Sequence, residues 1–104
     1  MKASTPFNES RREMLKDPEL AAMYLEESLE EGDINAFKQA LKQVAEARLG
    51  GLTELSRSTH LNREALYRAL SEKGNPRLDT LTKVLSAVGL RIGVSAQSLN
   101  QKHS

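Results

Sequence analysis

The sequence has no cysteine and few aromatic residues, and each shortage excludes a class of protein. Without cysteine among the 104 residues, disulfide frameworks and thiolate metal sites are excluded, and we expect a reducing, cytoplasmic setting. Aromatic residues make up only 4% of the chain, so the core has to be aliphatic. No apolar run approaches the ~18 residues of a membrane span, and we find no apolar signal segment.

The usual signatures of an enzyme are also missing. There is no cysteine nucleophile, no HExxH pattern and no phosphate-binding P-loop. The two histidines, His60 and His103, are 43 positions apart, whereas a metal site needs several converging ligands. A serine or threonine without a neighbouring base is only a hydroxyl. We therefore expect a protein that is not an enzyme and that holds no cofactor and no metal.

The chain does have the composition of one globular domain, with 38% hydrophobic and 28% charged residues. Its net charge of +1 hides an asymmetry, because residues 1–52 carry a net −3 and residues 53–104 a net +4. Two faces with different partners would explain this imbalance, and so would chance in a chain this short. A domain of this size with an aliphatic core would gain stability from dimerisation.

Capping residues and apolar spacing predict an all-α fold with five helices. Asp17 and Pro18 begin the first helix, and Gly32 ends it. Its apolar residues on or near one face are Leu20, Met23, Tyr24 and Leu29. Asp33 begins the second helix, which Gly50-Gly51 ends. There the apolar stripe is Ile34, Phe37, Leu41, Val44 and Leu49, with Lys38, Lys42 and Glu46 at polar positions between them.

Three shorter helices follow. One runs over about 53–58 with Thr53 as its cap, and one over 62–72 with Asn62 as its cap. The loop "EKGNPR", 72–77, precedes a last helix that starts near Leu78 and is closed by Gly89. We expect residues 17–96 to form the single domain, with a short strand in "LRIGVSA". Residues 1–16 are predicted as an arm without a helix, and residues 97–104 as a flexible tail.

Residues 52–72 have the pattern of a helix-turn-helix, the motif that places a second helix in the major groove of DNA. On a helical wheel, Ala65, Leu66, Ala69 and Leu70 share one side of the second helix. A turn at His60-Leu61 precedes it, and the small Ser56 lets the two helices approach. The opposite side carries the polar residues.

Those polar residues belong to the types that read DNA. Arginine pairs with guanine, asparagine with adenine, and tyrosine contacts thymine methyls or phosphates. The candidate base-reading residues are Asn62, Arg63, Tyr67 and Arg68. Phosphate contacts usually arise at helix ends and loops, where the candidates are Thr53, Arg57, Ser71, Lys73, Asn75 and Arg77.

Each of these residues also has a structural explanation. Asn62 would serve equally well as a helix cap only. The arginines would serve as solvated surface charges, with Arg68 paired to Glu64 or Glu72 at the spacing of one helical turn. Tyr67 would serve as a partly buried packing residue. On the motif alone, a helical hairpin without DNA function stays open.

The stretch "LTELSRSTHLNREALYRALSEKGNPRLDTLTKVLSAVGLRI", 52–92, resembles the Cro/cI-type (XRE) helix-turn-helix family. Together with "YLEESLEEGDINAFKQALKQVAEARLG" before it, the chain is similar to addiction-module antidote proteins, the HigA-like antitoxins, over about 18–92. That resemblance implies a dimer that represses its own operon by binding operator DNA and neutralises a RelE/ParE-like toxin. One departure is His60, at a turn position where the family often has glycine. Histidine tolerates a positive φ better than most residues.

The resemblance also raises the question of where a toxin would bind. Such toxins are usually small and basic, so an acidic surface would attract them. The acidic cluster is our candidate toxin-facing region, and its residues are Glu26, Glu27, Glu30 and Glu31. A solvated glutamate-rich helix face is the plainer interpretation. The alternative functions are a stand-alone or phage-type repressor without a toxin, and a protein-interaction module that does not read DNA.

Overall fold

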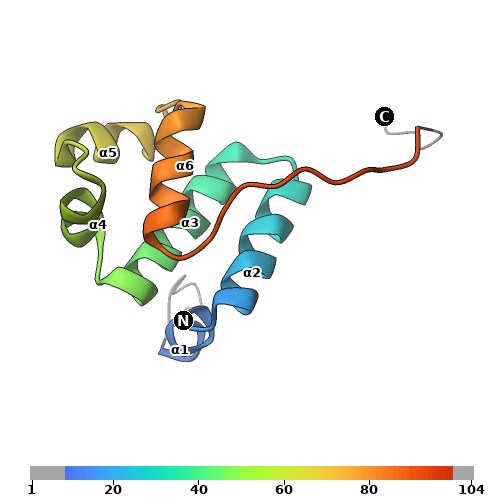
Figure 1. Ribbon diagram of the computed structural model, residues 1–104, viewed down its shortest axis with the longest axis horizontal. Coiled ribbons are helices and arrows are strands. Elements are labelled where there is room, and N and C mark those ends of the chain that lie inside the picture. Colours follow the sequence, from blue (N-terminus) through green and yellow to red (C-terminus); the bar gives the residue numbers. More distant parts are fainter. Residues whose placement is uncertain (1–8, 100–104) are drawn as a thin grey trace.

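The computed structural model describes residues 9–99, which form six α-helices and no β-strand (Figure 1). The helices are α1 (Glu9–Leu15), α2 (Pro18–Glu30), α3 (Ile34–Leu49), α4 (Leu52–Thr59), α5 (Arg63–Ala69) and α6 (Leu78–Ala87). The predicted all-α class is confirmed, with one helix more than the five expected. Within residues 9–99, no helix combines the length and apolar character needed to cross a membrane.

Local capping chemistry sets most of the helix ends. The Asp17 carboxylate accepts hydrogen bonds from the backbone N–H groups of Glu19 and Leu20, at 2.8 and 3.3 Å. Asp33 caps α3 in the same way, which satisfies N–H groups that have no partner inside the helix. Gly50 ends α3 in the left-handed conformation, with φ of 103°. These predicted helix boundaries are confirmed.

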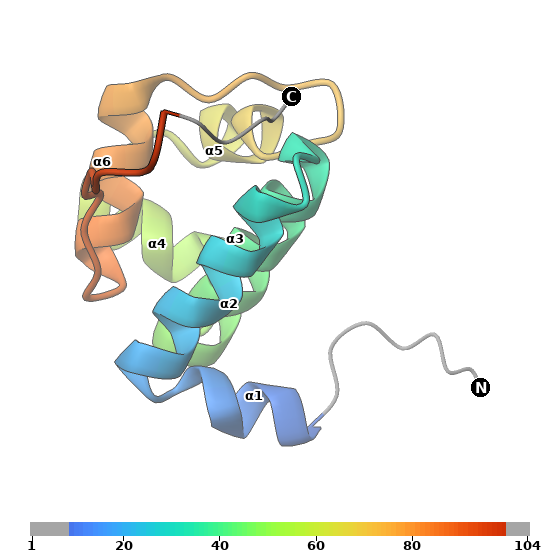
Figure 2. The same cartoon turned by 90° about the vertical axis from the view of Figure 1, so that its right-hand side faces the viewer.

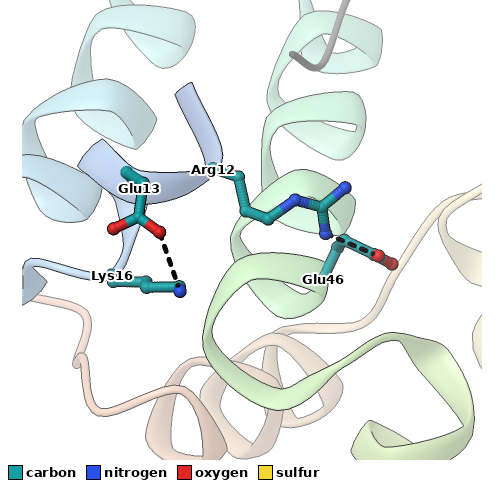
Figure 3. A network of polar contacts seen from close by, with 4 residues as sticks. All are labelled: Arg12, Glu13, Lys16 and Glu46. Carbon is teal, nitrogen blue, oxygen red and sulfur yellow. Dashed lines mark hydrogen bonds and ion pairs between the residues drawn. The ribbon is translucent and has the colours of Figure 1, made fainter. Parts of the chain in front are cut away.

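The helix α1 was not predicted, because residues 1–16 were expected to be an arm without a helix. Tertiary contacts hold this short helix in place. Leu15 is fully buried in the core, and the Arg12 guanidinium lies 3.0 Å from the Glu46 carboxylate of α3 (Figure 3). An isolated seven-residue helix is unstable in water, so packing rather than local sequence pattern creates α1. Residues 1–8 of the predicted arm lie outside the described residues.

A tyrosine on α2 ties the first three helices together. The Tyr24 hydroxyl donates to the Gln43 amide oxygen of α3 at 2.5 Å. It also accepts a hydrogen bond from the Arg11 guanidinium of α1 at 3.3 Å, and that guanidinium lies 5.3 Å from the ring centroid. Tyr24 therefore lies at the junction of α1, α2 and α3. Figure 2 shows α2 and α3 running side by side, with α1 across one end.

The core is aliphatic, as the composition predicts, with Phe37 as its one buried aromatic residue among those described. Leucines from all six helices meet in it: Leu15, Leu25, Leu41, Leu55, Leu66 and Leu85. One cluster therefore joins α1–α3 to the α4–α6 half. In this cluster α4 packs against the longer α3, and α5 packs against α4.

The predicted apolar face of the first long helix is wrong. Leu20, Met23 and Leu29 are 38%, 57% and 51% exposed. The buried face of α2 instead carries Ala21, Leu25 and Ser28. Ala21 and Ser28 are small, so α2 packs closely against its neighbours, and the larger apolar side chains stay at the surface.

Two further predictions fail, one at the start of α4 and one after α6. Thr53 does not cap α4, because the helix begins one residue earlier, with Gly51 at its N-cap and no side-chain capping bond. The strand expected in "LRIGVSA" does not form within the described residues, where 91–99 lie outside any helix or strand and are exposed. No other strand lies among residues 9–99, so this segment has no edge there to pair with. The predicted flexible tail lies outside the described residues from position 100 on.

Candidate nucleic-acid interface

The connection between α4 and α5 is three residues long, and its polar groups are paired. His60 closes α4 with φ of 62°, as the turn prediction requires, and its N–H donates to the Ser56 carbonyl at 2.8 Å. The Ser56 hydroxyl donates to the Leu61 carbonyl at 2.6 Å. The Asn62 side-chain oxygen accepts from the Ala65 N–H at 3.0 Å, which confirms its capping role. Ser56 therefore makes a hydrogen bond across the turn, and its small side chain also lets α4 and α5 approach each other.

The helix α5 presents a polar outer face. Leu66 and Leu70 are 1% exposed and hold the helix on the core, whereas Ala65, expected on the same inner side, is exposed. On the outer face, the Arg63 guanidinium lies 5.6 Å from the Tyr67 ring centroid, a cation–π arrangement. Tyr67 is 51% exposed and does not pack against the core cluster, which counts against the alternative interpretation as a partly buried packing residue.

The arginines of this face are available to a partner. Within residues 9–99, no ion pair joins Arg63 or Arg68 to a carboxylate. The pairing of Arg68 with Glu64 or Glu72, open from the sequence, does not form. Both guanidinium groups are exposed and keep their full set of donors for phosphate or base edges.

A shallow cleft runs beside α5, between that helix, the loop after it and the start of α6. We call it the basic cleft, because three cationic side chains and no carboxylate line it. Its residues are Ala65, Arg68, Ala69, Ser71, Lys73, Gly74, Asn75, Pro76, Arg77 and Thr80. The cleft therefore gathers one predicted base-reading residue with four of the six predicted phosphate contacts.

The two remaining phosphate candidates, Thr53 and Arg57, are exposed on α4 and lie outside the basic cleft. Arg57 lies 3.4 Å from the Glu54 carboxylate, and Arg77 at the cleft lies 3.2 Å from that of Asp79. Both pairs are exposed and contribute little to stability. The hydrogen bond from Arg77 lowers the pKa of the Asp79 carboxyl below its ordinary value.

A buried lysine, which the sequence pattern did not single out, holds the loop that lines the cleft. Lys38 was predicted at a polar position of its helix, but it is only 2% exposed. Its ammonium group donates to the carbonyls of Ser71, Glu72 and Gly74, at 2.7, 3.2 and 2.7 Å. Lys38 thus anchors the loop to α3 from inside. Its helical spacing to two apolar residues that are buried, Leu41 three positions later and Ala45 seven positions later, was the available signal.

The loop also depends on a glycine. A Cβ atom at Gly74 would lie 1.8 Å from the Arg68 carbonyl oxygen, far inside van der Waals contact. No larger residue fits there without moving the backbone. The close approach of the loop to the end of α5, together with the bonds from Lys38, fixes the floor of the basic cleft.

Comparison with known proteins gives the family. The family model described as "Probable addiction module antidote protein" matches residues 5–96. The chain belongs to this antidote family. It is also 38% identical over 82 residues to an uncharacterized protein of Haemophilus influenzae, covering 79% of this chain and 82% of the other. No solved structure gives a significant match.

Membership in the antidote family implies a toxin partner and a regulatory role rather than a catalytic one. The predicted acidic cluster, Glu26, Glu27, Glu30 and Glu31, lies exposed at the end of α2, on a different element from the basic cleft. Among the described residues, no His, Asp or Glu cluster has the arrangement of a metal site. The antidote chain therefore carries two charged surfaces of opposite sign.

Proposed function

We propose that this antidote is a DNA-binding antitoxin of a type II toxin–antitoxin module, in which α4 and α5 act as a Cro/cI-like helix-turn-helix of the XRE type. As a dimer it binds operator DNA, represses its own operon and neutralises a RelE/ParE-like toxin, as HigA-like antitoxins do. The observation that carries the proposal is the basic cleft beside an exposed, arginine-bearing α5. Family membership favours this function over a stand-alone repressor.

The side chains on α5 suit direct reading of bases. Arg63 and Arg68 form no ion pair with any described residue, and each presents the planar fork that guanine O6 and N7 accept in the major groove. Tyr67, beneath the Arg63 guanidinium, offers a ring face to a thymine methyl. Asn62 is the weaker candidate, because its side-chain oxygen already accepts the capping bond, and bidentate pairing with adenine needs that same oxygen.

The loop after α5 suits phosphate contacts. Lys73 and Asn75 are exposed at the cleft, and Ser71 is half-buried there with its hydroxyl donating to the Arg68 carbonyl. These contacts would fix the position of the protein on the duplex without reading its sequence. Thr53 and Arg57 on α4 would contact the backbone on the other side of α5. Two copies bound to a palindromic operator would read half-sites about 34 Å apart.

The test of DNA reading is fluorescence anisotropy with a labelled duplex from the region upstream of the operon and with a scrambled duplex, over a salt series. We expect tight binding to the first duplex only, with a steep salt slope. Arg63→Ala should weaken operator binding by ~1–3 kcal/mol and relax specificity at one base pair. Lys83→Ala is the matched control, since Lys83 is exposed on α6 away from the cleft. Equal weak binding to both duplexes would favour the interaction-module alternative.

The toxin part of the proposal rests on family membership and on the acidic cluster. We expect the small basic protein encoded beside this gene to co-purify with the full chain. Replacing Glu27, Glu30 and Glu31 together with glutamine should slow its association, most strongly at low salt. Failure of any neighbouring product to bind, with operator binding intact, would leave the stand-alone repressor.

A further inference from the structure

A second surface, on the side of the molecule that α2 and α6 share, is apolar and uncovered. We call it the α2–α6 groove. It lies between these two helices, the start of α3 and residues 90–93. Three of its aliphatic side chains stay about half exposed: Leu29 at 51%, Ile34 at 50% and Ile92 at 43%. Large exposed apolar side chains gathered at one groove mark a contact surface rather than ordinary solvent-facing residues.

The C-terminal segment, residues 91–99, starts in this groove and leaves it. Arg91, Ile92 and Gly93 line the groove, whereas Val94 and Leu99 are 99% and 98% exposed. Figure 1 shows the segment extending away from the helices. Within residues 9–99, the side chains of Val94 and Leu99 are almost fully exposed and gain little packing energy, so they and the groove would both be stabilised by a partner that covers them.

We propose that a second copy of this chain covers the α2–α6 groove, with the C-terminal segment of each copy lying in the groove of the other. Residues 94–99, fully extended, reach about 20 Å, enough to cross a two-fold axis beside the groove. Twelve residues line the groove, and residues 94–99 bring the surface to eighteen, close to the ~20–30 residues per side of a stable interface. The groove without the exchanged segment would be too small.

The charges at the groove favour a second copy over a basic toxin. Its lining carries one carboxylate, Glu26, and one guanidinium, Arg91. Within residues 9–99 neither of them forms an ion pair. Across a two-fold axis, Glu26 of one copy would lie opposite Arg91 of the other, and Arg91 opposite Glu26, because an isologous interface makes every contact twice. A strongly basic partner could pair with Glu26 but would leave Arg91 without an opposite charge.

This inference deepens the dimeric state in the proposed function, and its test uses no DNA and no toxin. Sedimentation velocity of the full chain over a concentration series gives the dimer dissociation constant. We expect Glu26→Arg alone and Arg91→Glu alone each to raise it by at least about tenfold, because like charges then face each other. An equimolar mixture of the two variants should dimerise again, since every pair across the interface is then of opposite sign. If Glu26 and Arg91 acted within one chain, mixing the two variants would not restore the dimer.

Two matched pairs of variants test the apolar part. Leu29→Lys should weaken the dimer, whereas Leu78→Lys should not, because Leu78 is 69% exposed on α6 outside the groove. Val94→Asp should weaken it by more than about tenfold, since a buried valine is lost from each copy. Ser95→Asp, on the opposite side of the extended segment, should change it little. Thermal melting by circular dichroism checks that each variant is folded.

Three results would overturn the inference. The first is a wild-type chain that stays monomeric at tens of micromolar. That result would count against this interface whether or not the chain binds DNA. The second is a dimer that both charge variants leave intact. The third is a monomer whose toxin binding is lost in Leu29→Lys, which would assign the groove to the toxin. Loss of operator binding alone, with the dimer intact, would count against the proposed function and not against this interface.

Discussion

Replacing Lys38 with methionine would test whether the buried ammonium group holds the loop at the basic cleft. Methionine has a similar length but donates nothing, so three carbonyl oxygens lose a donor at 2.7, 3.2 and 2.7 Å. An unsatisfied buried carbonyl costs ~1–3 kcal/mol, and water at this partly exposed loop recovers some of that cost. Burial of an apolar chain in place of a cation offsets a further part. We expect the free energy of unfolding to fall by about 3 kcal/mol.

The measurement is urea unfolding followed by circular dichroism, since the chain has no tryptophan to report by fluorescence. In thermal melts the same loss should lower the Tm by about 10–20 °C for a domain of this size. Lys42→Met is the matched control, one turn along α3 and half-buried, and should change stability by less than about 0.5 kcal/mol. Amide exchange at residues 71–74 should rise in Lys38→Met only.

Equal stability of the two methionine variants would refute this reasoning. It would mean that desolvating the ammonium group cancels the three bonds, so the lysine would be neutral to folding. A loss of stability without faster exchange in the loop would mean that Lys38 acts through the core and not through the carbonyls. Either result would remove the argument that α3 fixes the floor of the cleft.

Three further predictions follow from single sites. Gly74→Ala should lower the Tm by several degrees or more, because its Cβ would overlap a backbone oxygen; an unchanged Tm would mean that the loop moves without cost. His60→Gly should raise the free energy of unfolding by about 0.5 kcal/mol in denaturant titration, since relief of the left-handed backbone exceeds the entropy cost of glycine; a decrease would mean that the turn is not strained. NMR titration should find the pKa of Asp79 below its ordinary value, and Arg77→Gln should raise it toward that value, because the hydrogen bond from Arg77 is the largest cause of the shift. The depressed pKa means that this pair stabilises the fold at neutral pH and stops doing so as the pH falls below about 4.

The features that could be predicted from the sequence are those with local causes. Asp17, Asp33 and Asn62 each cap a helix with a side-chain oxygen two or three residues from the N–H groups they serve. The positive φ of His60 follows from the same short turn between two apolar helices. Gly50 likewise ends α3 by its own backbone freedom. Such signals need no knowledge of the rest of the fold.

The features that could not be predicted depend on partners far along the chain. The helix α1 depends on Leu15 in the core and on an ion pair that Arg12 makes with a residue 34 positions away. Lys38 is buried because it bonds a loop 33 to 36 positions later. The expected strand needed a pairing edge, which the described residues do not supply. At the candidate interface, the sequence shows which residue types are present. It does not show that the fold places them around one cleft.

The placement of the two tyrosines would allow NMR to follow two surfaces of the protein separately. The chain has only Tyr24 and Tyr67, the first at the junction of α1, α2 and α3 and the second on the outer face of α5. Fluorotyrosine incorporation would therefore give a spectrum of two resonances, one for each surface. A ligand that occupies α5 would move one signal, and a partner seated on the first three helices would move the other, in the same sample and without any labelling mutation.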